Sequence, residues 1–268
     1  MNSQAPSASG HPAWNDESLA ARMADVRGRM AAASARAGRP AGETLLVAVS
    51  KTVPAERLLA AAALGLTVFG ENRVQEARDK RERLAELAAT DTQAARLLAG
   101  MRWELIGHLQ SNKAARALEL FERIQSVDSL RLAEALSARA VALGRTLPIL
   151  LEVNIGEEPS KSGFAPDEVV SAARAIAALP GLRPEGLMTV APLVERAEEV
   201  RPYFRRMRAL REELRATAPT GGRDETEAWH ELSMGMTDDF EVAIEEGSTL
   251  IRVGRGLFGA RPALHADQ

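Results

Sequence analysis

The chain has no cysteine, a single tyrosine and no apolar run long enough to cross a bilayer. Without cysteine it can form no disulfide, no thiolate metal site and no cysteine nucleophile. Its formal net charge is −3 at pH 7, which disfavours a general nucleic-acid binder because such proteins carry a basic excess. Residues 1–12 have neither the positive start nor the apolar core of a secretion signal. We therefore expect a cytoplasmic protein without a membrane span.

Lysine is also scarce, since only four of the 34 basic residues are lysines. One of them, Lys51, stands where the apolar run 45–50 ends. An amine at a strand end can pair with a carboxylate, bind a phosphate or form a Schiff base with a carbonyl group. An arginine can do the first two but not the third. A lysine in an arginine-rich chain therefore favours carbonyl chemistry, although the residues alone leave all three roles open.

Short apolar runs alternate with amphipathic helical stretches along the chain. We predict strands at 45–50, 67–70, 102–107, 123–127, 147–154, 183–190, 231–235 and 250–253. We predict helices at 17–37, 55–64, 73–88, 112–120, 129–143, 166–178, 193–216 and 238–246. Apolar strands that alternate with helices are typical of a parallel sheet covered by helices. Eight such units favour an α/β fold of the (β/α)8 TIM barrel type, preceded by an extra N-terminal helix.

The alternative is an open doubly wound sheet, which would need a glycine-rich turn after the first strand. The first strand is followed instead by Ser50-Lys51-Thr52, which favours the barrel. We predict a disordered N-terminal tail over residues 1–13, one barrel domain over 14–262 and a C-terminal tail over 263–268. The polar stretch 217–229 is predicted to be a surface loop on the side away from the active face.

Barrel enzymes carry their chemistry at the C-terminal ends of the strands. In this chain those positions are rich in polar residues and glycines, namely 50–52, 71–72, 107–108, 126–128, 154, 188–189, 233–237 and 252–256. The loops after strands seven and eight often bind phosphate. There, Gly235, Gly254 and Gly256 allow the backbone to come close to a ligand, while Ser233 and Thr237 offer hydroxyls.

Each of these features also has an ordinary explanation. A cluster of serine, glycine and threonine at a strand end is more often a turn than a phosphate site. Glu71 and Asn72 could cap the following helix, and His108 could be a simple loop histidine. Asp238 and Asp239 suit the dipole of the helix they open but would repel an anion, so we expect them to face away from it. The joint placement at one end of one barrel is what favours a ligand site.

The chain is similar to a known family between residues 45 and 261. The matching motifs are VSKT (49–52), FGENRVQE (69–76), WELIGHLQSNK (103–113), VNI (153–155), SKSGF (160–164), GLMT (186–189), LSMGMTDDF (232–240) and RVGRGLFGAR (252–261). In this order they resemble the pyridoxal phosphate homeostasis proteins, which are single-domain relatives of the alanine racemase N-terminal barrel. The resemblance implies that pyridoxal 5'-phosphate (PLP) is the cofactor.

The resemblance also implies a role for each matching site residue. Lys51 would form a Schiff base with the aldehyde of PLP, Asn72 would lie near the phenolic oxygen of the ring, and Arg252 would lie against the pyridine nitrogen. The phosphate would be held, largely by backbone N–H groups, at Ser233, Gly235, Met236 and Gly254. The chain departs from the family in having Glu104 where a histidine is expected and Arg255 where a threonine is common.

An arginine at the pyridine nitrogen cannot accept the proton that makes PLP a strong electron sink. Racemisation also needs a second base on the other face of the substrate. In the racemases that base is a tyrosine supplied with a separate β-domain, whereas Tyr203 is predicted to lie within a helix. We therefore predict a PLP-binding homeostasis protein with no catalytic residue and no metal. The alternatives are a minimal amino-acid racemase and a Schiff-base aldolase that acts on a phosphorylated substrate without PLP.

The predicted partners are PLP itself and PLP-dependent apoenzymes that receive it, and the chain is expected to be a monomer that binds neither nucleic acid nor membrane. Lys113 and Lys161 lie in matching motifs. We predict that both lie near the mouth of the site and accept PLP transiently during transfer. Ordinary surface salt bridges are the competing explanation.

Overall fold

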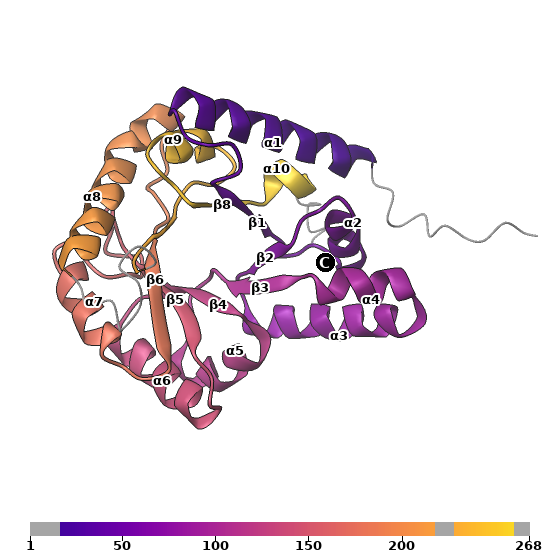
Figure 1. Ribbon diagram of the computed structural model, residues 1–268, viewed down its shortest axis with the longest axis horizontal. Helices are drawn as coiled ribbons and strands as arrows, with labels where there is room; N and C mark the ends of the chain where they lie inside the picture. Colours follow the sequence, from indigo (N-terminus) through magenta and orange to yellow (C-terminus); the bar gives the residue numbers. More distant parts are fainter. Residues whose placement is uncertain (1–16, 218–227, 260–268) are drawn as a thin grey trace, which may run out of the picture.

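The computed structural model describes residues 17–217 and 228–259 (Figure 1). The predicted tails over 1–13 and 263–268 lie outside these ranges, as does most of the predicted loop 217–229.

Within these ranges the strands form a closed barrel in which all neighbours are parallel, so the predicted (β/α)8 fold is confirmed. The strands are β1 (Leu45–Val49), β2 (Val68–Glu71), β3 (Arg102–Leu105), β4 (Arg123–Val127), β5 (Leu147–Glu152), β6 (Leu182–Met188), β7 (Glu231–Ser233) and β8 (Leu250–Val253). The barrel closes where β8 pairs with β1, from Leu45 opposite Leu250 to Ala48 opposite Val253. The predicted strands 123–127 and 250–253 have the same bounds as β4 and β8.

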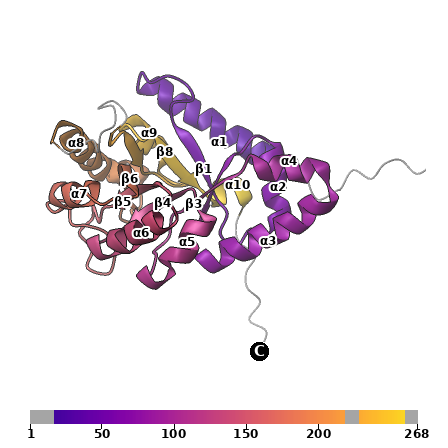
Figure 2. The same ribbon diagram turned by 60° about the horizontal axis from the view of Figure 1, so that its bottom comes forward.

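Helices surround this barrel in Figures 1 and 2. The α-helices are α1 (Glu17–Arg36), α2 (Ala55–Ala63), α3 (Val74–Thr90), α4 (Thr92–Ala99), α5 (Ala114–Leu120), α6 (Leu130–Ala142), α7 (Val169–Ala177), α8 (Arg201–Thr217), α9 (Phe240–Glu245) and α10 (Arg255–Phe258). Two short 3-10 helices, η2 (Ser111–Lys113) and η3 (Ala197–Val200), precede α5 and α8. No helix in the described part of the chain is long and apolar enough to cross a membrane.

The sequence pattern did not predict α4 and α10, and it began the predicted helix 193–216 too early. The segment after α3 turns at Asp91, whose carboxylate accepts hydrogen bonds from the N–H groups of Gln93 and Ala94 and so starts α4. The predicted helix 193–216 begins only at Ala197, and Leu193 before it is 97 % exposed. The short helix α10 directly follows β8 and was not predicted.

The core has two layers that follow the alternation of side chains along the strands. On β1, Leu46 and Ala48 pack outward against the helices, while Val47 packs inside the barrel. The inner apolar cluster consists of Val47, Val68, Leu150, Met188 and Leu250. It is small because polar side chains from several strands fill much of the barrel interior, and these side chains lead to the candidate site.

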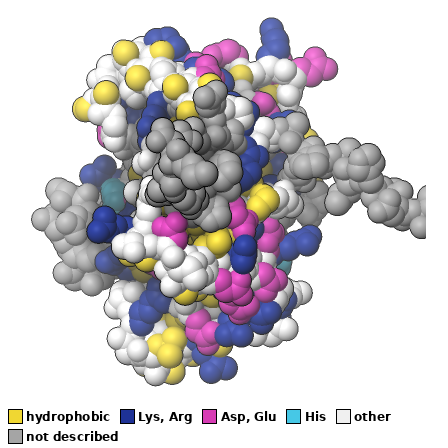
Figure 3. Space-filling model, turned by 90° about the vertical axis from the view of Figure 1, so that its right-hand side faces the viewer, with side chains coloured by type: hydrophobic (Ala, Val, Ile, Leu, Met, Phe, Trp, Pro, Cys, Tyr) yellow, Lys and Arg dark blue, Asp and Glu magenta, His cyan; other side chains and the backbone are white. Residues whose placement is uncertain are grey.

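The extra helix α1 covers the barrel near the seam between β8 and β1 (Figures 1 and 2). It packs against α9 and α10, with Leu19, Met23 and Val26 buried. Its Arg29 pairs with Glu241 of α9 at 2.8 Å. The helix therefore supports the two elements that follow β7 and β8. On the face seen in Figure 3, basic side chains lie among acidic ones without a broad area of one sign.

Candidate functional site

The predicted site residues all lie toward the C-terminal ends of four successive strands of the closed barrel, β7, β8, β1 and β2. Lys51 lies just beyond β1, and Asn72 directly follows β2. Ser233 ends β7, Gly235 and Met236 follow it, Arg252 lies in β8 and Gly254 follows β8. Because parallel strands end at the same edge, the barrel brings these positions to one mouth.

 Counted from Lys51, Asn72 lies 21 residues and Ser233 lies 182 residues further along the chain. β1 pairs directly with β2, whereas β7 is joined to β1 through β8, where the barrel closes.

Arg252 is the buried cation of this mouth, with 3 % of its surface exposed. Its Nη1 donates to Oγ of Ser233 at 2.6 Å, and its Nη2 donates to the carbonyl oxygen of Thr189 at 2.6 Å. Burial lowers the pKa of Arg252 to about 10, and the negative charges of Asp239 and Glu152 oppose this. The guanidinium is therefore charged at neutral pH and is held rigidly by two hydrogen bonds.

A chain of hydrogen bonds continues from Ser233 through the barrel interior. Its hydroxyl bonds with Oε1 of Gln125 at 2.6 Å, and Nε2 of Gln125 donates to Glu104. β4 and β7 are not neighbours in the sheet, so the Gln125–Ser233 bond crosses the interior. Glu104 in turn pairs with Arg123 at 2.7 Å. The unexpected Glu104 thus lies inside the barrel and connects the site to an ionic cluster at the other end.

The loop after β7 requires a glycine at position 235. Its φ is +92°, a region that residues with a Cβ rarely adopt. A Cβ there would also lie 2.5 Å from Cβ of Ala243 and 2.9 Å from Cα of Phe240. At Gly254 the space is less tight, since a Cβ would meet the carbonyl oxygen of Val49 at 3.3 Å. Both loops therefore pass close to neighbouring backbone at the mouth.

Side chains join the loops after β7 and β8 to one another. The hydroxyl of Thr237 accepts a hydrogen bond from the N–H of Gly256 at 3.4 Å. Nη2 of Arg255 pairs with Oδ2 of Asp238 at 2.6 Å on the exposed surface. The unexpected Arg255 thus has a carboxylate partner on the neighbouring loop.

The expectation that both aspartates face away from the loop is wrong for Asp239. Its Oδ1 accepts a hydrogen bond from the N–H of Met236 at 2.5 Å, which places a carboxylate on one of the amides predicted to hold phosphate. Burial raises the pKa of Asp239, and the hydrogen bond from Met236 opposes this. The sequence could not show that this short side chain would turn back onto the loop before it.

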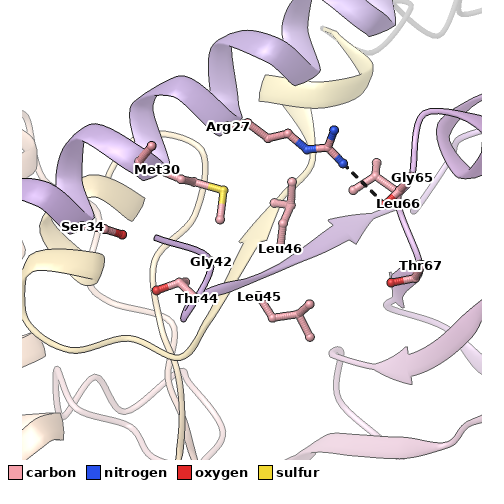
Figure 4. Close-up of a pocket in the computed structure, with 11 residues that line it drawn as sticks. Arg27, Met30, Ser34, Gly42, Thr44, Leu45, Leu46, Gly65, Leu66 and Thr67 are labelled. Atoms are coloured by element: carbon pink, nitrogen blue, oxygen red, sulfur yellow. Dashed lines mark hydrogen bonds between the residues drawn. The ribbon is translucent and has the colours of Figure 1, made fainter. Parts of the chain in front are cut away.

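Two cavities on the described residues help to locate the site. One of about 240 Å³ lies between the loops after β1 and β8 and is lined by Lys51, Gly254 and Arg255, among others. The other, of about 330 Å³, lies under α1 beside the start of β1 and the residues before β2 (Figure 4). In it, Arg27 donates to the carbonyl oxygens of Leu64 and Gly65. Only the first lies at the end of the barrel that carries Lys51.

Several of the other polar residues singled out in the sequence have structural partners. Nδ1 of His108 lies 2.9 Å from Oδ2 of Asp128 on the mouth side. Lys161 pairs with Glu158 at 2.6 Å in the loop after β5, and Lys113 is exposed in the 3-10 helix η2 after β3. Both lysines therefore lie on loops at the C-terminal end of the barrel, and a role in transfer stays a prediction.

The helix-capping explanation for Glu71 does not hold. The N-cap of α3 is Arg73, which makes no side-chain capping bond, and Glu71 is instead fully buried. Its Oε1 contacts Ser50 and Lys80, both at 2.7 Å. Gly107 lets the loop after β3 come against Asn72, because a Cβ there would lie 2.4 Å from the carbonyl oxygen of Asn72. Sequence reasoning missed both packing relations, since each joins residues from different barrel units.

Glu152, at the end of β5, is a further site residue that sequence reasoning missed. Burial raises its pKa to about 7, and the charge of Asp128 adds to this, while Arg252 and His108 oppose it. No local pattern distinguishes this glutamate, because its environment is made by β4, β8 and the loop after β3. It places a titratable group near Arg252.

Substitution of Glu152 with glutamine should stabilise the protein at pH 8 but not at pH 5. A carboxyl group whose folded-state pKa is raised contributes stability below its ordinary value of 4.5, and this is lost as the pH rises through about 7. The difference corresponds to about 3 kcal/mol. Thermal unfolding of Glu152→Gln and wild type at both pH values measures it, with the exposed Glu119→Gln as control. An equal change at both pH values would contradict the assignment.

Comparison with known proteins defines the class first. The family described as alanine racemase, N-terminal domain, matches residues 23–262. Solved alanine racemase from Clostridium difficile shares this fold, with a TM-score of 0.63 at 14 % identity, over 91 % of this chain and 56 % of that chain. The fold and the matched range therefore define a barrel of the alanine racemase N-terminal class.

More similar relatives then give the particular family. The pyridoxal phosphate homeostasis protein of Aquifex aeolicus is 40 % identical over 90 % of this chain and 97 % of its own length. That of Pseudomonas aeruginosa is 40 % identical over 91 % of this chain and 96 % of its own. The structure of PipY from Synechococcus elongatus PCC7942 with PLP bound has a TM-score of 0.74 at 37 % identity, over 90 % of this chain and all of that chain. The chain belongs to the pyridoxal phosphate homeostasis protein family.

Proposed function

We propose that this chain binds PLP as a Schiff base at Lys51 and acts in PLP homeostasis by storing, protecting or delivering the cofactor. The observation that carries the proposal is the buried Arg252, bonded to Ser233 at the same barrel end as Lys51. A fixed cation, a lysine and two glycine-containing loops at one mouth suit a ligand with an aldehyde and a phosphate. The membership of the family and the PLP-bound relative support the same cofactor.

The residues present fit PLP. When bound, PLP supplies an aldehyde that an amine can capture, a phosphate and an aromatic ring. Gly235 and Gly254 keep side chains away from the loops after β7 and β8, so the backbone there can approach an anion. Ser233 is held in place by Arg252, and the backbone of Gly107 packs closely against that of Asn72. For the N–H of Met236 to reach the phosphate, Asp239 must give up its hydrogen bond to that amide.

We propose that the protein turns over little or no substrate. Arg252 is charged and cannot accept a proton, so a pyridine nitrogen facing it would stay unprotonated and the ring would be a weak electron sink. The only tyrosine, Tyr203, lies in α8 and packs against the outer core. It is therefore placed as a packing residue and not as the second base that racemisation needs.

Borohydride reduction of the PLP-loaded protein followed by peptide mapping tests this function. We expect one reduced pyridoxyl group, on the peptide that contains Lys51, together with visible Schiff-base absorbance before reduction. Wild-type protein without that absorbance would contradict PLP binding. Chiral chromatography of alanine, serine and glutamate tests the racemase alternative, and turnover well above that of free PLP would establish it. Trapping of a keto substrate at Lys51 without PLP would establish the aldolase alternative.

Delivery to PLP-dependent apoenzymes is the finer part of the proposal. Lys161 and Lys113 lie on loops at the mouth end, where a transferred cofactor would pass. We propose that the chain acts as a monomer and that these lysines carry PLP transiently. Pyridoxyl modification at either residue after rapid reduction during transfer would support this role, and modification of Lys51 alone would count against it.

A further inference from the structure

Lys80 is a buried lysine next to the loop that carries Lys51. It lies in α3 and is only 8 % exposed. Its Nζ donates to the carbonyl oxygen of Ser50 at 2.5 Å and to Oε1 of both Glu71 and Glu76 at 2.7 Å. All three donor positions of the ammonium group are therefore used within the protein.

The acceptors of Lys80 hold the chain on both sides of Lys51. On one side, the carbonyl of Ser50 is bound to Lys80, and the Ser50 hydroxyl donates to Glu71 at 2.7 Å. On the other side, Oε1 of Glu76 accepts a hydrogen bond from the N–H of Thr52. The turn that carries Lys51 is thus tied to α3 and β2 at both of its neighbouring residues.

The turn needs such support because Thr52 has a φ of +64°. A β-branched residue adopts this left-handed conformation only at a cost in free energy. The contacts of Glu76 and Lys80 offset that cost. Without them, the turn would be expected to relax toward an ordinary conformation and change the direction in which Lys51 points.

The charged states of Lys80, Glu71 and Glu76 depend on one another. Glu71 is fully buried, and its Oε2 has no hydrogen-bond partner among the described residues. Burial raises the pKa of Glu71, and the Lys80 charge opposes this. Removal of Lys80 alone would therefore leave a buried carboxylate without its cation, which is strongly destabilising. A fair test has to remove both charges together.

We propose that Lys80 is a positioning residue for Lys51, which uses Ser50, Glu71 and Glu76 to hold the 50–52 turn ready before the cofactor arrives. The proposal rests on the proposed function, because it assigns the geometry of the same PLP site. It adds Lys80, which lies in α3 and not in one of the loops that directly follow the strands. Glu71 directly precedes Asn72, so the same group also fixes the start of that loop.

The test compares wild type with the double variant Lys80→Met/Glu71→Gln and with Glu76→Ala, which removes only the acceptor of the Thr52 amide. The control is Arg83→Met on the same helix, since the partners of Arg83, Glu56 and Glu86, lie toward the surface. Amide hydrogen exchange of the peptide spanning 45–58 is measured in the apoprotein. PLP affinity is followed by Schiff-base absorbance, and inorganic phosphate affinity by its competition with PLP.

In both test variants we expect faster exchange at Thr52 and PLP affinity about tenfold weaker, the effect of losing one charged hydrogen bond. Phosphate affinity should stay unchanged, because the loops after β7 and β8 are untouched. A merely structural role would weaken phosphate binding and PLP binding together, and that result would overturn the proposal. The proposal would also be overturned if Glu76→Ala, which keeps the Lys80–Glu71 pair, had the same amide exchange rate and the same PLP affinity as wild type.

A failure of the proposed function gives a different result. In that case wild-type protein forms no Schiff base at all, whereas the exchange measurement still reports whether Lys80 and Glu76 hold the turn. If only the positioning role fails, wild type still binds PLP, and the PLP affinity of the variants is either unchanged or weakened together with their phosphate affinity.

Discussion

Replacement of Arg123 with methionine is expected to lower the free energy of unfolding by about 3–5 kcal/mol at neutral pH. Arg123 starts β4 and lies inside the N-terminal end of the barrel. It pairs with Glu104 at 2.7 Å, Glu231 at 3.0 Å and Glu185 at 3.1 Å. Methionine has a similar length but no charge, so the variant leaves three carboxylates close together without their shared cation.

The pH dependence of this loss follows from Glu231. Burial alone would raise its pKa, but the hydrogen bond from His230, the charge of Arg123 and the hydrogen bond from Thr249 together lower it to about 2. A lowered pKa contributes stability above the ordinary value of 4.5, and this contribution is lost as the pH falls toward 2. In the variant the part of this contribution that depends on the Arg123 charge is absent at every pH. The loss of stability relative to wild type should therefore be largest at pH 7 and smaller near pH 4.

Urea unfolding at pH 7 and pH 4 measures both parts of this prediction. The control is Arg116→Met, because Arg116 pairs only at the surface with Glu119 and should change stability by less than about 1 kcal/mol. A loss below 1 kcal/mol for Arg123→Met would show that the carboxylates find other partners. A loss that does not change with pH would show that packing, and not charge, causes it.

The sequence predicted the barrel because each of its units carries its own local signal. An apolar run such as 45–50 and the helix after it can be recognised without knowledge of the rest of the chain. The site loops could be predicted for a related reason, since polar residues and glycines at strand ends meet automatically once the strands are parallel. Closure of β8 onto β1 then brings Lys51 beside Gly254.

The partners of the site residues could not be predicted in the same way. Gln125 and Ser233 are 108 residues apart and meet only across the barrel interior. Glu104 could be noticed as a departure from the family, but its bonds to Arg123 and Gln125 depend on the inward direction of side chains on β3 and β4. The direction of Asp239 depends on the loop conformation set by Gly235. Such relations come from packing and not from the local pattern.

The three roles that the sequence leaves open for Lys51 make different predictions for two substitutions. We expect Lys51→Ala to lose both the Schiff-base absorbance and the borohydride-trapped product completely. Lys51→Arg should lose them equally, because a guanidinium keeps the charge but does not form a Schiff base under these conditions. If Lys51 served only as a phosphate ligand or an ion-pair partner, arginine would preserve most of the PLP affinity that alanine loses.

The same pair of variants also separates the lysine from the phosphate loops. Ser233, Gly235 and Gly254 are unchanged in both, so each variant should still bind inorganic phosphate, and Lys51→Arg at least as tightly as Lys51→Ala because its charge remains. Phosphate competition against a fluorescent PLP analogue measures this, and peptide mapping after reduction measures the trapped product. Trapping that persists in Lys51→Arg would move the Schiff base to another lysine, and Lys161 and Lys113 would be the first to examine because their loops lie at the same end of the barrel.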